Sequence, residues 1–188
     1  MCKYKLTSLT QLNESMIIDP EDKKILEGMA GRRSRRNTRV LCLSSDWSSE
    51  LMWTFYANNH RGICLCFDAH HDFFKTAKPV LYTHAPTDVV HLAAADGTVD
   101  RLAFCKSVAW QFQKEWRIVY PDVEPKKVQF PKESLVAVIL GYRFPEPSFN
   151  DLKDVLIKHG YRVDVFRIER VPNSFELKLL NTGRITPA

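Results

Sequence analysis

The sequence lacks any long hydrophobic run. No apolar stretch approaches the roughly 20 residues that a membrane-spanning helix needs, and the first ten residues, MCKYKLTSLT, lack the apolar segment of a signal peptide. We therefore expect no membrane partner and a cytoplasmic location. The chain also has no glycine-rich phosphate loop, no nucleophile elbow and no internal repeat. These absences remove the P-loop and serine-hydrolase motifs from consideration.

Cysteine is present in an odd number, which argues against a framework of disulfides. The five cysteines lie mostly in apolar segments, as small hydrophobic residues do: Cys2, Cys42, Cys64, Cys66 and Cys105. The stretch CLCFDAHH adds His70 and His71, but Cys-x-Cys followed by adjacent histidines does not have the spacing of usual zinc sites. We therefore predict a reduced compartment and no metal.

Positive charge is in moderate excess and unevenly distributed. The formal net charge is +5, and the segment GRRSRRNTR, residues 31–39, holds five arginines. We interpret it as a connecting loop between a helix and a strand. A field of this sign attracts the phosphates of a nucleotide or nucleic acid. The alternative is a solvated loop that binds nothing.

The order of the predicted elements indicates an α+β protein. Composition and length suit one globular domain over residues 1–188, with a mixed or antiparallel sheet and flanking helices. Periodicity and capping residues predict helices over residues 21–31, 49–59, 99–112 and 147–160. Alternation predicts strands over residues 38–45, 63–68, 115–121, 134–141, 162–169 and 175–181, with Ile63, Leu65 and Phe67 on one face.

The helix predicted over residues 49–59 carries unusual aromatic side chains. At about 100° per residue, Trp53, Tyr56 and His60 share a sector beside the one that holds Leu51, Met52 and Phe55. Rings with polar tips bury well only where a polar partner or a ligand meets them. Two interpretations stay open: these rings pack under a loop, or they face a ligand.

A second group lies at the predicted junction of helix and strand, KSVAWQFQKEWRIVY. Lys106, Trp110 and Gln113 fall on one side of the helix, and Glu115 and Arg117 share one face of the strand that follows. One interpretation is an ordinary ion pair on a sheet face. The other is a carboxylate held in a cleft walled by aromatic rings.

The two motifs, in this order and spacing, resemble the bacterial and phage family known as domain of unknown function 2971. The resemblance covers roughly residues 1–140 and rests on these matching positions: Trp53, Tyr56, Ala57, Gly62, Lys106, Trp110, Glu115 and Arg117. The sequence departs from the family pattern in two places. Gln113 stands where the family tends to have Glu, and LNESMIIDP, which keeps Asn13, stands where it has Asn-Asp-Pro.

The resemblance implies a distant relation to the ADP-ribosyltransferase fold, with NAD as substrate. It implies Glu115 and Gln113 as catalytic residues, and the following residues as contacts of the cofactor: Trp53, Tyr56, His60, Lys106 and Arg117. A carboxylate near the ribose would stabilise the oxocarbenium-like transition state of this reaction. The alternative function is a non-catalytic binding module for an anionic partner, either a nucleotide or a nucleic acid.

Overall fold

The computed structural model describes residues 6–8, 39–84, 103–120 and 129–187. Its main sheet has eight strands in the order β10 (Leu177–Ile185), β9 (Val163–Arg170), β8 (Leu135–Leu140), β3 (Ile63–Phe67), β1 (Leu6–Ser8), β2 (Arg39–Ser44), β7 (Glu115–Tyr120) and β4 (Lys78–Pro79). A smaller parallel pair joins β5 (Leu81–Thr83) to β6 (Cys105–Ser107).

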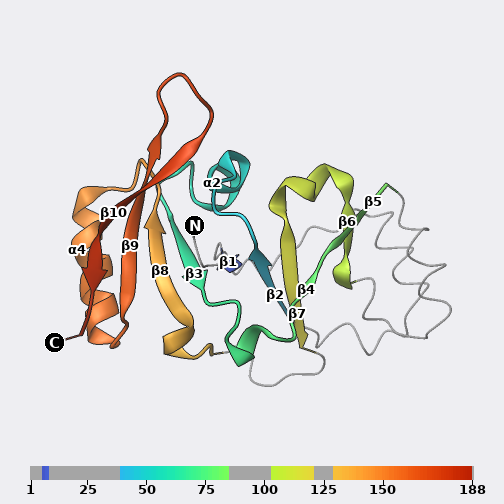
Figure 1. Cartoon of the computed structure of the whole chain (residues 1–188), viewed down its shortest axis with the longest axis horizontal. Helices are drawn as coiled ribbons and strands as arrows, with labels where there is room; N and C mark the ends of the chain where they lie inside the picture. The colour runs from blue at the N-terminus through green and yellow to red at the C-terminus, as the bar shows by residue number, and fades with distance from the viewer. Residues whose placement is uncertain (1–5, 9–38, 85–102, 121–128, 188) are drawn as a thin grey trace.

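In the described ranges two α-helices lie against the main sheet, which confirms the α+β class. They are α2 (Glu50–Tyr56) and α4 (Glu146–Lys158), and three 3-10 helices complete the described elements: η1 (Asp72–Phe74), η3 (Val108–Gln113) and η4 (Lys132–Ser134). Figure 1 shows α4 along β9 and β10 at one end of the sheet and α2 nearer its middle. Within the described part of the sheet, β8 and β9 pair in parallel, across the α4 connection, and the other neighbours are antiparallel.

The core forms two clusters because alternate residues of each central strand point to opposite faces. Val138 of β8 packs with Leu156 of α4 on one face, while Ile139 packs with Trp53 of α2 on the other. We call these the α4 face and the α2 face. The predicted shared face of Ile63, Leu65 and Phe67 is confirmed, since Phe67 belongs to the cluster on the α4 face and Ile63 and Leu65 pack against it.

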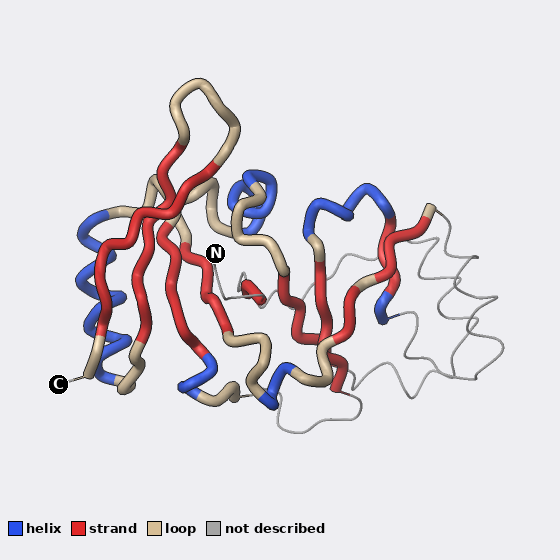
Figure 2. The backbone as a smooth tube through the Cα atoms, viewed as in Figure 1, coloured by secondary structure: helices blue, strands red, loops and turns tan. Residues whose placement is uncertain are grey.

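Most of the predicted elements are confirmed within a few residues. The six predicted strands correspond to β2, β3, β7, β8, β9 and β10, and the helix predicted over 147–160 corresponds to α4, with Gly160 at φ 73° just beyond its end. Figure 2 shows the loop that joins β9 to β10 projecting beyond the sheet. The helix predicted over residues 21–31 and the arginines of residues 31–38 lie outside the described residues.

The helix predicted over residues 99–112 is wrong within the described part of that range. Cys105–Ser107 forms β6, which pairs with β5, and only then does the chain turn into η3. Ser107 caps η3, because its hydroxyl accepts a hydrogen bond from the amide of Ala109 at 3.4 Å. Strand pairing with a distant segment therefore outweighs the helical periodicity of residues 105–107.

The helix α2 begins where the sequence indicates and ends early. The Ser49 hydroxyl accepts a hydrogen bond from the Met52 amide at 3.4 Å, which is an N-cap. The predicted end was Asn59, but the helix ends at Tyr56 because three consecutive residues, Asn58, Asn59 and His60, take positive φ values of 48°, 52° and 64°. This left-handed turn ends α2 before it can bring His60 onto the face that holds Tyr56.

Candidate functional site

The candidate site lies on the α2 face of the sheet, where β2 and β7 pair. Ser44 stands opposite Glu115, and Cys42 stands opposite Arg117. The residue between them, Leu43, belongs to the core on the α4 face. The alternation of β7 therefore places Glu115 and Arg117 on the α2 face together, as the sequence predicts.

Glu115 and Arg117 form a nearly buried ion pair with two hydrogen bonds. Arg117 Nε lies 2.9 Å from Glu115 Oε1, and Arg117 Nη2 lies 3.0 Å from Glu115 Oε2. The side chains are 7% exposed for Glu115 and 12% exposed for Arg117. The remaining Arg117 nitrogen, Nη1, donates to the Ala103 carbonyl. This fork geometry fixes the carboxylate far more firmly than a surface ion pair would.

Lys106, Gln113 and Tyr56 complete the network around Glu115. Lys106 Nζ lies 3.2 Å from Glu115 Oε2 and also donates to Gln113 Oε1. The amide nitrogen of Gln113 donates to the Tyr56 hydroxyl at 2.6 Å. Tyr56, Lys106, Gln113, Glu115 and Arg117 thus form one connected network, which we call the Glu115 cluster.

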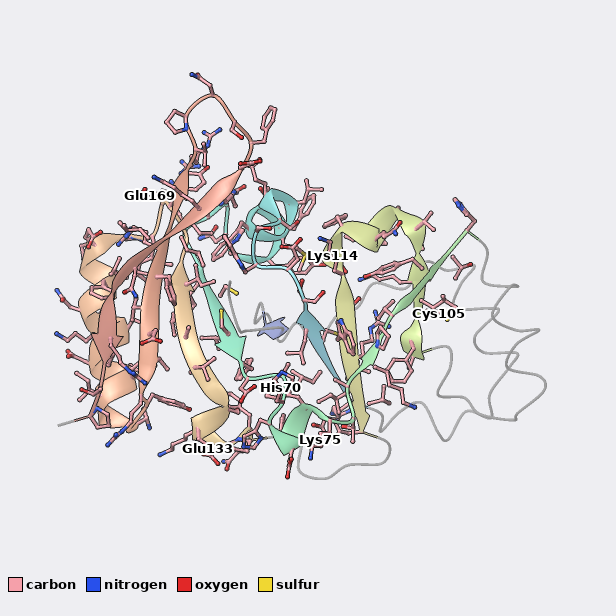
Figure 3. The ribbon with its side chains drawn as sticks, in the orientation of Figure 1. His70, Lys75, Cys105, Lys114, Glu133 and Glu169 are labelled. Atoms are coloured by element: carbon pink, nitrogen blue, oxygen red, sulfur yellow. The ribbon has the colours of Figure 1, made fainter. Side chains whose placement is uncertain are left out.

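The junction between η3 and β7 is held by the end of β2. Lys114 takes a left-handed conformation with φ 43°, which turns the chain from η3 into β7. Its carbonyl accepts a hydrogen bond from the Ser45 amide at 3.1 Å, and the Gln113 carbonyl accepts one from the Ser44 hydroxyl at 2.7 Å. Lys114 Nζ pairs with Asp46 at 2.7 Å, so its side chain, labelled in Figure 3, lies over the end of β2. These bonds fix the direction in which Gln113 and Glu115 leave the junction.

Two residues of the site, Tyr82 and Cys42, are not predicted from the sequence. The Tyr82 hydroxyl accepts a hydrogen bond from the Glu115 amide at 2.8 Å. Cys42 exposes part of its surface, but its sulfur lies beside Glu115, and burial together with the Glu115 charge raises the pKa of the thiol to about 12. The pairing of β2 with β7 brings Cys42 to the site, opposite Arg117. No sequence pattern connects Tyr82 with Glu115.

The electrostatics keep Glu115 ionised. Burial alone would raise the pKa of this carboxyl, but the hydrogen bonds and charge of Arg117, with the charge of Lys106, hold the pKa below its ordinary value of 4.5. Burial also raises the pKa of the Tyr56 hydroxyl. At neutral pH the cluster therefore presents one carboxylate, two cations and a neutral phenol. Such a set can bind an anion and stabilise a neighbouring positive charge.

Trp53 and His60 lie apart from the Glu115 cluster. Trp53 is 1% exposed in the core on the α2 face, and its indole nitrogen donates to the Trp47 carbonyl at 2.6 Å. The His60 ring lies 6.1 Å from the Trp53 ring and 4.4 Å from the Tyr142 ring, measured between centroids. Of the predicted site residues, these two pack in the core, while Tyr56, on the next turn of α2, reaches the cluster.

His60 gives the first testable prediction, because the residue is 6% exposed and its Nδ1 has no hydrogen-bond partner among the described residues. Burial lowers the pKa of His60 below its ordinary value of 6.5, and the charges of Arg143 and Arg170 act in the same direction, against that of Glu50. The unfolded chain therefore binds this proton more tightly than the folded protein. Its contribution to stability is complete above the unfolded pKa and is lost as the pH falls below it.

The expected result is that the free energy of unfolding falls as the pH is lowered below the ordinary pKa of 6.5, and falls less steeply in His60→Asn. Asparagine suits the positive φ of this position. Urea unfolding at several pH values measures both slopes, with His70→Asn, at an exposed position, as the control. Equal slopes for the wild type and His60→Asn would show that His60 does not titrate in this way.

Neither the described residues nor the likeness to known proteins gives a further guide to function. Among the described residues, no three His, Cys, Asp or Glu side chains gather so that they could hold a metal ion. None of the helices in the described ranges is long and apolar enough to cross a membrane. No family model, no curated protein and no solved structure matches the chain. The family resemblance and the NAD chemistry therefore stay predictions.

Proposed function

We propose that the Glu115 cluster binds a nucleotide of the NAD type and that Glu115 assists cleavage of the nicotinamide–ribose bond, as in ADP-ribosyl transfer. One observation carries this proposal: a buried carboxylate, two cations, an amide and a phenol from four elements form a single network on one face of the sheet. Cations suit a pyrophosphate, and an ionised carboxylate suits a ribose that becomes positive in the transition state.

The two cations of the cluster differ in how easily they can leave Glu115. Arg117 makes two hydrogen bonds to the carboxylate and one to the Ala103 carbonyl. Lys106 makes one contact with the carboxylate, at 3.2 Å, and its side chain is 23% exposed. We therefore assign the pyrophosphate to Lys106, whose movement removes one of the two cationic contacts of Glu115 Oε2 and leaves the contact with Arg117 Nη2 at 3.0 Å. Arg117 remains in place as a positioning residue.

The proposed reaction requires no oxidant or reductant, because one bond is broken and one is formed at the same ribose carbon. The bond between ribose C1′ and the nicotinamide nitrogen breaks, and its electron pair leaves with nicotinamide. The positive charge that develops on the ribose is stabilised by the Glu115 carboxylate. A water molecule, or the hydroxyl of an acceptor, then adds its oxygen to C1′ and releases a proton. Free nicotinamide is therefore the product to measure.

The second prediction is that Glu115→Gln lowers nicotinamide release by about a hundredfold while NAD affinity changes only a few-fold. A carboxylate that acts on a developing charge contributes mainly to the transition state, so its loss reduces turnover rather than binding. Calorimetric titration with NAD measures affinity, and chromatography of the products measures nicotinamide. The matched control is Glu133→Gln, because the Glu133 side chain is 73% exposed and lies outside the cluster.

Each outcome of this experiment decides part of the proposal. Thermal unfolding of Glu115→Gln confirms first that the variant is folded. A wild-type protein that neither binds nor cleaves NAD overturns the proposal as a whole. If the wild type binds NAD without releasing nicotinamide, the transfer reaction is wrong, and the alternative of a non-catalytic nucleotide-binding module takes its place.

A further inference from the structure

Three aromatic rings lie in contact beside the Glu115 cluster and take no part in its hydrogen bonds. Phe55 of α2 is 59% exposed, Trp110 of η3 is 41% exposed, and the half-buried Phe112 lies between them. The Phe112 ring is 6.2 Å from the Phe55 ring and 5.9 Å from the Trp110 ring, measured between centroids. We call Phe55, Phe112 and Trp110 the aromatic platform.

The core does not explain the aromatic platform. Neither buried cluster of the described residues includes these three rings among its members or its packed neighbours. A single exposed aromatic side chain is common on a protein surface, but rings in mutual contact form a patch, and such patches mark binding surfaces. The residue beside Phe55 on α2, Tyr56, turns instead toward Gln113. The platform therefore adjoins the Glu115 cluster without taking part in its hydrogen bonds.

Positive charge borders the aromatic platform. Lys106 Nζ lies 5.0 Å from the centre of the Trp110 ring, which is a cation–π contact. Lys114, which follows Phe112 closely in the chain, is 59% exposed. Around the junction of η3 and β7, the three cations Lys106, Lys114 and Arg117 stand against the two carboxylates Asp46 and Glu115. This local excess has the same sign as the net charge of the chain, +5.

From these observations we propose that the aromatic platform binds single-stranded nucleic acid. Exposed rings offer faces on which bases stack, and neighbouring cations attract the phosphates of the same strand, which is how proteins hold single strands without reading their sequence. A duplex keeps its bases stacked inside and has no free face to offer. A purely apolar protein partner would gain nothing from the cations. The proposal shares Lys106 with the NAD chemistry, but its three rings take no part in that chemistry, and stacking on them does not depend on it.

The test is fluorescence anisotropy of a labelled short oligouridylate or oligothymidylate, with the wild-type chain and the double variant Phe55→Ala/Trp110→Ala. We expect the double variant to bind about tenfold more weakly or worse, because each ring that stacks on a base contributes to affinity. The matched control is Phe175→Ala, which removes a phenylalanine that is 86% exposed on the loop between β9 and β10. This control is expected to bind like the wild type. Thermal unfolding confirms that both variants are folded.

Several results would overturn the proposal. They are an oligonucleotide affinity too weak to detect, equal losses in the double variant and in Phe175→Ala, and equal affinity for a duplex of the same length. Competition by inorganic polyphosphate as effective as that by the oligonucleotide would also overturn it, because charge alone would then account for binding. Since NAD cleavage is measured with Glu115→Gln and stacking with the platform variants, the failure of one proposal is distinguishable from the failure of the other.

Discussion

Arg117→Met is expected to destabilise the protein by about 3 kcal/mol or more, which is the usual cost of leaving one member of a buried ion pair without its partner. Glu115 is 7% exposed, and both of its oxygens accept hydrogen bonds from Arg117. Methionine fills part of the same volume but offers no charge. The carboxylate would then keep one cationic contact, with Lys106 at 3.2 Å. Urea unfolding at neutral pH measures the loss.

A second variant tests whether charge, rather than packing, causes this loss. Adding Glu115→Gln to Arg117→Met removes the unpaired charge, so the double variant is expected to be more stable than Arg117→Met alone. The matched control is Arg184→Met, because Arg184 is 65% exposed and pairs with Asp164 at 3.5 Å. Its loss is expected to stay within about 1 kcal/mol. Equal losses for Arg117→Met and Arg184→Met would contradict the importance assigned to burial.

Gly141→Ala is expected to lower the free energy of unfolding by about 3 kcal/mol or more, which is at the upper end of the usual cost of overpacking a core. A Cβ atom at Gly141 would lie 2.0 Å from the His60 carbonyl oxygen and 2.6 Å from its carbon. Both atoms belong to backbone that is already held in place. The Arg143 amide donates to the His60 carbonyl at 3.0 Å, and the Gly141 amide donates to the Gly62 carbonyl at 3.0 Å. Neither segment can move without breaking these bonds.

The control for this prediction is Gly160→Ala. Gly160 has φ 73°, which strains an alanine, but apart from its chain neighbours no atom of the described residues lies within 4 Å of the position of its Cβ. Its substitution is therefore expected to cost only about 1–2 kcal/mol of backbone strain. Thermal and urea unfolding measure the stability of both variants, so the effect of a steric clash at Gly141 can be compared with that of backbone strain at Gly160. If Gly141→Ala lowers the free energy of unfolding no more than Gly160→Ala does, the close approach of the His60 backbone to Gly141 does not constrain the fold.

Six strands could be predicted because their side chains alternate between two faces that need different residues, whereas β1, β4, β5 and β6, of two or three residues each, are too short to show such alternation. Glu115 and Arg117 alternate with Trp116 and Ile118, which pack against the core on the α4 face, so the shared face of the ion pair follows from β7 alone. Helical spacing predicts Lys106 and Gln113 on one side of a helix, and their observed contact arises instead from a strand followed by a 3-10 helix. The two arrangements bring the same residues together by different backbone paths.

The remaining parts of the site depend on contacts between distant segments. Trp53 and Tyr56 lie three residues apart on one helix, yet one fills the core and the other reaches Gln113. Helical periodicity gives the relative directions of their side chains but not the neighbour that each direction meets. Tyr82 belongs to β5, and its bond to Glu115 depends on how that strand pair lies over β7. Long-range pairing of this kind leaves no local pattern in the sequence.

Because β1 is short, α2 contributes to holding the two halves of the main sheet together. At three residues, β1 stands between β3 and β2, and its pairing with β2 places Thr7 opposite Ser44. In the backbone pairing of the sheet, the half that carries Glu115 is therefore joined to the half that carries β8 and β9 through this three-residue strand, while the core on the α4 face packs side chains of both halves together. The helix α2 contacts both halves on the α2 face. Trp53 packs against residues of β8 and β9, and Tyr56 accepts a hydrogen bond from Gln113, which precedes β7. A displacement of Gln113 would thus be transmitted, through one turn of α2, to the packing around Trp53.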